Sequence, residues 1–185
     1  MTRPLFASIA GVLLFVTGCS TPPDKERHQA EGAIAAAREA GAAEYASADL
    51  VSAQTALDKY EAAVAQRDYR LALSLAVEAR DTAYHAAKRA ADNKAAARSN
   101  ADLLRADLTR LLPVARARLA ATASRGALTA KLRAAVTDAE NALQESRAAM
   151  EQQSYQAAID RLQPVDDVLH AEMGATAAPS LKRLK

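Results

Sequence analysis

Apolar side chains recur at steps of three and four residues through most of the chain, a spacing that places them on one face of an α-helix. A first helix is expected over about Lys25–Ala40, with Gly41 as its stop signal. A second helix is expected to begin near Ser47 or Asp49, which are both favourable N-cap residues. The apolar seam of this second helix comprises Leu50, Ala53, Leu57, Tyr60 and Val64.

After a turn at Arg67–Tyr69, a stripe made mainly of alanine runs from position 72 to position 115. If Asp68–Leu112 is one helix, it is about 65 Å long, and so long a helix needs partners that cover its stripe. Asn93 within the stripe either selects the packing register or marks a break or bend at Asp92–Lys94, and we favour the break or bend. Pro113 is expected to kink or end the helix.

The last third of the chain repeats this organisation. Ser124–Gly126 is expected to form a turn, and a helix then leads to a second polar turn at Gln153–Ser154. The apolar seam continues across Pro164, and the residues beyond Gly174 are expected to form a disordered basic tail. The segment around Tyr69 aligns with the segment around Tyr155 at an offset of 86 residues, which indicates a duplicated helical hairpin.

The composition favours helices that pack along thin seams. Hydrophobic residues make up 50% of the sequence, but aromatic residues make up only 4%, and alanine, the best helix former, dominates. An ordinary globular core needs more large side chains than this. The expected fold class is therefore all-α, with elongated antiparallel helical hairpins or a helical bundle built on a long central helix.

The first twenty residues have the parts of an export signal. Arg3 gives a positive start, and Leu5–Val16 is an uncharged, mostly apolar run that is too short to span a bilayer. The sequence Val16-Thr17-Gly18-Cys19 resembles the lipobox of bacterial lipoproteins, in which the cysteine is acylated and the bond before it is cut. The alternative is an ordinary signal peptide with a chance cysteine.

The lipobox resemblance implies a covalent lipid on Cys19, and Ser20 in place of Asp after it implies the outer membrane, with the protein facing the periplasm. Cys19 is the sole cysteine, so a disulfide within the chain is excluded. The expected organisation is a signal peptide at 1–18, a lipidated tether at 19–24, a helical hairpin domain with the long helix at 25–123, a second helical hairpin at 124–173 and the tail at 174–185.

A second resemblance rests on Ala37–Ala46, on the apolar steps that follow it, and on Asp68-Tyr69 with a Leu-Ala pattern after it. These residues resemble an alanine-rich helical domain of bacterial envelope lipoproteins, the domain of unknown function 4398 family, over roughly Gln29–Ala97. Some members carry an OmpA-like peptidoglycan-binding module. We find no such module here, so peptidoglycan binding is not implied. The family often has proline where this chain has Ser47, and it offers no catalytic residues to transfer.

Charge is nearly balanced overall but uneven along the chain. Residues 78–133 contain twelve basic and five acidic side chains, whereas residues 138–172 contain two basic and eight acidic ones. These segments are either solvated faces of exposed helices, or they attract each other, or the basic one meets an anionic envelope polymer. Nucleic acid is not an expected partner, because only Tyr84 among the aromatic residues lies within the basic segment.

Two Asp–His pairs are the candidate metal ligands. Asp81 with His85, and Asp166 with His170, each have the four-residue spacing that puts a carboxylate and an imidazole on one helical face. Four ligands could converge if the two hairpins packed side by side, while solvated Asp–His pairs are the simpler interpretation. No nucleophile motif or glycine-rich phosphate loop occurs in the sequence, so we expect neither an enzyme nor a cofactor other than the lipid on Cys19.

These observations favour a non-enzymatic cell-envelope lipoprotein that acts as a periplasmic helical scaffold, spacer or interaction module. Its expected partners are the membrane, through the lipid, and other envelope proteins or a second copy of itself. The first alternative is a periplasmic carrier that binds a small molecule or metal between the hairpins. The second is an accessory subunit of an enzyme.

Overall fold

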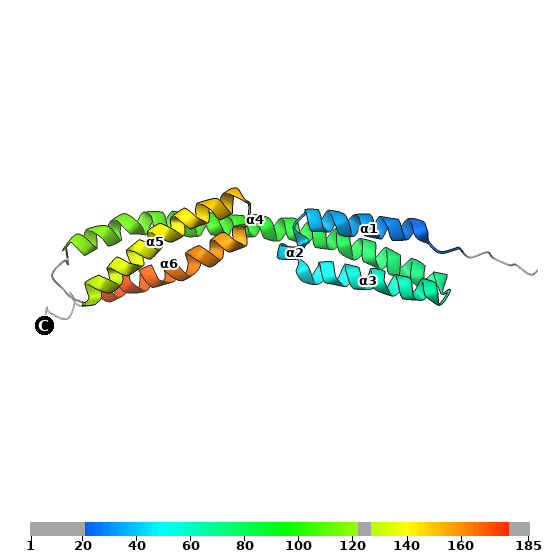
Figure 1. The fold of residues 1–185 in the computed structure, drawn as a ribbon. Helices are drawn as coiled ribbons and strands as arrows, with labels where there is room; N and C mark the ends of the chain where they lie inside the picture. The colour runs from blue at the N-terminus through cyan, green and yellow to red at the C-terminus, as the bar shows by residue number, and fades with distance from the viewer. Residues whose placement is uncertain (1–20, 122–126, 178–185) are drawn as a thin grey trace, which may run out of the picture.

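The computed structural model describes residues 21–121 and 127–177, and within these ranges the chain forms six α-helices and no strand (Figure 1). The expected all-α fold is therefore confirmed. None of the helices in these ranges has the length and apolar character needed to cross a bilayer. The signal segment, Cys19, the turn expected at Ser124–Gly126 and residues 178–185 lie outside the described residues.

The helices form two three-helix bundles that share one long helix. The order is α1 (Asp24–Glu39), α2 (Ala42–Tyr45), α3 (Ser47–Ala65), α4 (Tyr69–Ala121), α5 (Ala127–Glu151) and α6 (Tyr155–Ala177). In the first bundle, α1 and α3 pack on the N-terminal half of α4, and in the second bundle α5 and α6 pack on its C-terminal half (Figure 1). The bundles lie end to end, because no Cα atom of α1, α2 or α3 lies within 8 Å of one in α5 or α6.

Helix α4 contains 53 residues without interruption, which corresponds to a length of about 80 Å. The break favoured at Asp92–Lys94 is wrong, although the rod bows gently where the bundles meet (Figure 1). Asn93 does not break the helix, and its exposed side-chain amide donates a 2.7 Å hydrogen bond to the carbonyl of Tyr45, at the end of α2. We call Ala91–Asn100 the waist, because eight of these ten residues are exposed and only Lys94 and Ala97 are half-buried.

The expected stop at Pro113 is also wrong, since α4 continues to Ala121. Pro113 lies on the exposed side of the helix, so the carbonyl of Thr109 that loses its amide partner faces water. Pro164 is likewise exposed inside α6, where the seam continues across it as expected. Gly174 does not begin a tail, because α6 runs to Ala177.

The alanine stripe is the buried seam of the first bundle, as predicted. Its six alanines on α4 have no exposed surface and pack against α1 and α3, and they are Ala72, Ala76, Ala79, Ala83, Ala86 and Ala90. Tyr60 is the largest buried side chain in this seam. The second bundle is built differently, with leucines at its centre: Leu108, Leu132, Leu162 and Leu169, all fully buried.

The helices begin close to the expected residues, but their caps follow the sequence only in part. Gly41 ends the first helical segment in a left-handed conformation (φ 86°), as its role as a stop signal requires. Helix α3 begins at Ser47, but the N-cap position is Ala46 and no side chain caps it, so the expected capping role of Ser47 or Asp49 is wrong. Asp68 does cap α4, because its carboxylate accepts a 3.0 Å hydrogen bond from the backbone N–H of Leu71.

The two hairpin turns have the same geometry at the offset of 86 residues. Arg67 (φ 60°) and Gln153 (φ 59°) both adopt the left-handed conformation. Each is followed by an amide that bonds five residues back, from Asp68 to the Ala63 carbonyl and from Ser154 to the Ala149 carbonyl, both at 2.9 Å. These hydrogen bonds form a Schellman motif at the end of a helix. The sequence alignment of the two hairpins thus corresponds to a repeated backbone structure.

Glycine at these turn positions is expected to stabilise the fold. A side chain at positive φ costs about 1–2 kcal/mol, and the greater freedom of glycine in the unfolded chain offsets part of the gain. Arg67→Gly should therefore raise the free energy of unfolding in urea by about 0.5–1 kcal/mol. Gln66→Gly is the control, because Gln66 has an ordinary helical φ of −84°, and it should lower stability. Equal effects from both substitutions would contradict this explanation of the turn.

Candidate functional site

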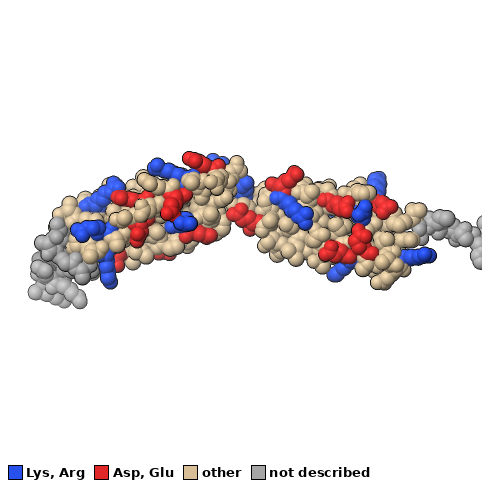
Figure 2. Space-filling model, in the orientation of Figure 1, with Lys and Arg blue, Asp and Glu red and all other residues tan. Residues whose placement is uncertain are grey.

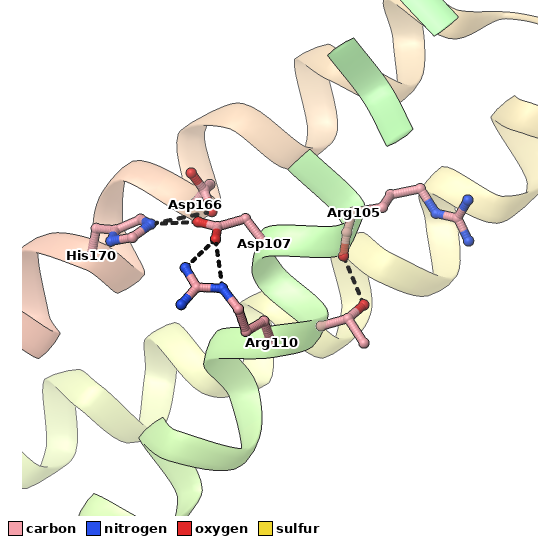
Figure 3. Close-up of polar contacts among 6 residues, drawn as sticks. Arg105, Asp107, Arg110, Asp166 and His170 are labelled. Atoms are coloured by element: carbon pink, nitrogen blue, oxygen red, sulfur yellow. Dashed lines mark hydrogen bonds and ion pairs between the residues drawn. The ribbon is translucent and has the colours of Figure 1, made fainter. Parts of the chain in front are cut away.

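The principal cluster of potential ligand side chains in the described residues joins α4 to α6 in the second bundle. It comprises Asp107 on α4 and Asp166 and His170 on α6, and one ligand atom from each lies within 4.8 Å of the others (Figure 3). The seams on either side position these residues. Asp107 directly precedes the buried Leu108, and His170 directly follows the buried Leu169. Helices α4 and α6 run in the same direction (Figure 1). The side chains that flank their buried leucines meet between the two helices.

The histidine lies between the two carboxylates. Its Nε2 atom is 2.7 Å from Oδ2 of Asp107 and 3.8 Å from Oδ1 of Asp166. Arg110, one turn further along α4, approaches Asp107 from the other side and donates to Oδ1 from Nη2 at 2.5 Å and from Nε at 3.2 Å (Figure 3). The two oxygens of Asp107 therefore have different partners, an arginine and a histidine.

Asp166 is the residue that the polar network does not satisfy. Only 14% of its side-chain surface is exposed, and its Oδ1 atom is buried without a hydrogen-bond donor among the described residues. Burial raises the pKa of Asp166, an effect that His170 opposes and the charge of Asp107 increases. By contrast, hydrogen bonds from Arg110 and His170 lower the pKa of Asp107. The site thus contains one well-paired carboxylate and one that lacks a partner.

The structure brings together only one of the two Asp–His pairs predicted from the sequence. Asp81 and His85 lie on α4 in the first bundle, where the guanidinium of Arg80 donates to Asp81 at 2.8 and 2.9 Å. His85 and Asp107 are 22 residues apart on the same helix, which corresponds to about 33 Å. The four residues, which could have converged if the hairpins packed side by side, do not meet, because the hairpins lie end to end.

Asp107 could not be recognised from spacing within one helix, because it lies on α4 and the other two residues of the cluster lie on α6. The available signal was its place beside the α4 seam, next to Leu108, which matches the place of His170 beside Leu169 in α6. Recognising the site also required the relative direction and register of α4 and α6, and neither can be read from the spacing of one helix.

The hollows found on the described surface are open to solvent. One, of about 400 Å³, lies beside Leu103 on α4. Two others lie beside the waist, where side chains of both bundles meet: one of about 330 Å³ between Tyr45 and Gln156, and one of about 390 Å³ between Ala40 and Tyr155. A carrier site needs a concave and mostly apolar cavity, and open hollows of this kind do not provide one.

Charges of both signs are interspersed over the two bundles (Figure 2). The basic segment 78–133 and the acidic segment 138–172 do contact each other between α4 and α5, where Arg116 pairs with Glu140 at 2.5 Å. Both side chains are exposed, so this pair contributes little to stability.

Comparison with known proteins finds no matching family model, no matching curated protein and no matching solved structure.

Proposed function

We propose that this chain is a non-enzymatic lipoprotein of the bacterial cell envelope, and that it serves as a rigid periplasmic spacer or interaction module anchored to the outer membrane through Cys19. The observation that carries the proposal is the rod itself. The two bundles lie in line on one helix of about 80 Å. The resulting rod is longer than a compact arrangement of the same two cores would be.

The position of the chain start supports this role. Pro22 and Pro23 lead directly into α1, which begins at one tip of the rod, beside the turn between α3 and α4 (Figure 1). Helix α6 ends at the opposite tip. A lipid on Cys19, only five residues before α1, would hold the first tip at the bilayer, while the second bundle would extend away from it.

The described surface does not favour one docking face. Its exposed large apolar side chains are spread over both bundles instead of forming one patch: Val51, Leu71, Leu73, Tyr84, Leu103, Val114 and Val168. Single exposed apolar residues of this kind are normal on soluble surfaces. They do not identify a partner, which is why capture in intact cells is the informative approach.

The anchoring part of the proposal is tested by Cys19→Ala in the producing bacterium. Without the thiol no thioether can form, so we expect complete loss of acylation and accumulation of a precursor that retains residues 1–18. Incorporation of an alkyne-tagged fatty acid and intact-mass measurement report both effects. Ser20→Ala is the matched control and should remain acylated. A wild-type protein that is unacylated and still carries its first eighteen residues would exclude the proposed anchor and compartment.

A further inference from the structure

Two carboxylates and one imidazole meet at the α4–α6 seam. The guanidinium of Arg110 pairs with one of these carboxylates, that of Asp107. Arg110 contacts only Oδ1 of Asp107, which leaves Oδ2 directed toward His170 and Asp166 (Figure 3). Oδ1 of Asp166 is buried there without a donor, and an unpaired buried carboxylate oxygen is costly.

We propose that Asp107, Asp166 and His170 form a binding site for a divalent transition-metal ion of the Zn²⁺ type, which cross-links α4 to α6. The ligand types fit, because zinc takes imidazole nitrogen and carboxylate oxygen at about 2.0–2.2 Å. Tetrahedral ligands at that bond length are about 3.3 Å apart. The distances of 2.7 and 3.8 Å from His170 Nε2 to the two carboxylates lie on either side of this value.

The surroundings match those of a site with three protein ligands. Arg110 would remain hydrogen-bonded to the outer oxygen of Asp107 and orient the carboxylate, as groups behind metal ligands commonly do. His170 is 49% exposed, so the fourth position would face solvent and hold a water molecule. The ion would supply the positive charge that Oδ1 of Asp166 lacks.

The first bundle provides the matched control. Asp81 and His85 have the same spacing on a helix as Asp166 and His170, but Asp81 is paired with Arg80 and no third ligand joins the pair in the described residues. A protein that bound zinc merely through i, i+4 Asp–His pairs would use both sites. The proposal requires binding at the second bundle only.

The test uses the full-length, tag-free chain in detergent with Cys19→Ala, so that no thiol competes for the metal. Titration with Zn²⁺ followed by calorimetry should show one saturable site. His170→Gln, Asp107→Asn and Asp166→Asn should each weaken binding by at least about tenfold, and Asp81→Asn combined with His85→Gln should leave it unchanged. Because Asn and Gln preserve side-chain size, the circular dichroism of the chelated proteins is expected to stay that of the parent.

A second measurement separates a metal site from a purely structural polar network. Zn²⁺ should raise the melting temperature of the parent protein and of the Asp81/His85 double variant, but not that of His170→Gln. A polar network alone would make the melting temperature of every protein independent of Zn²⁺, which would overturn the proposal. Zinc binding that survives all three single substitutions, or that is lost in the Asp81/His85 variant, would overturn it as well. Neither measurement depends on lipidation, so the anchor and the metal site can fail independently.

Discussion

Replacing Leu108 by aspartate is expected to unfold the second bundle and to leave the first bundle folded. Leu108 is fully buried at the centre of the leucine cluster formed by α4, α5 and α6. Truncating such a leucine to alanine costs about 2–5 kcal/mol, and an uncompensated buried carboxylate adds to that cost. The total approaches the whole stability of a small domain, which is about 5–15 kcal/mol.

The loss should stay within one bundle because the two cores are separate. Buried residues of the first bundle cluster with α1 and α3, and those of the second with α5 and α6. The N-terminal half of α4 therefore keeps its partners when the C-terminal half loses them. Limited proteolysis with mass spectrometry should release fragments of α5 and α6 and leave a resistant fragment that contains α1, α3 and the start of α4.

Leu103→Asp is the control, since Leu103 lies on the same helix five residues earlier and is 67% exposed. It should leave both bundles resistant to protease. Complete unfolding of the Leu108→Asp protein in a single transition would show instead that the bundles fold as one cooperative unit, contrary to the separation of their cores.

Helix positions and seams were the predictable part of this structure. The alanine stripe at Ala72–Ala90 and the paired turns at Arg67 and Gln153 could be predicted from the spacing of nearby residues, because a helix buries residues at regular steps of three and four. The short helix α2 was not predicted, because four residues are too few to show a helical period of apolar positions.

The wrong predictions share a cause. The effect of a single residue on a helix was predicted from its type, but it also depends on which other helices pack around it. Pro113 removes a hydrogen bond in any helix, but here the freed carbonyl faces water and Leu111, Leu112 and Ala115 hold both sides in the core. Asn93 interrupts an apolar stripe, yet its side chain is exposed and its amide is satisfied by the Tyr45 carbonyl at the end of α2, so a polar residue is tolerated there. The candidate site was predictable only in part for a related reason. Two of its residues share a helix, but Asp107 comes from another.

Proline at the waist is expected to bend or break the rod without unfolding either bundle. Ala95 is exposed and lies between the two cores, so Ala95→Pro removes no tertiary contact. It removes the hydrogen bond to the Ala91 carbonyl and introduces a steric clash, a cost of about 3 kcal/mol in a helix interior. The natural Pro113 and Pro164 are tolerated because helices pack around them, whereas at the waist α4 is the one described helix that belongs to both bundles.

Small-angle X-ray scattering should therefore show a shorter maximum dimension for Ala95→Pro, with nearly unchanged helix content by circular dichroism. Ala95→Glu is the matched control, because glutamate is a good helix former and should preserve the extended rod. If the maximum dimension did not change, contacts beside α4, such as the 3.0 Å hydrogen bond from Lys94 to Gln153, would have to hold the bundles in line. The proposed spacer role requires a fixed length, and that length depends on the ten residues of α4 that the other helices leave largely uncovered.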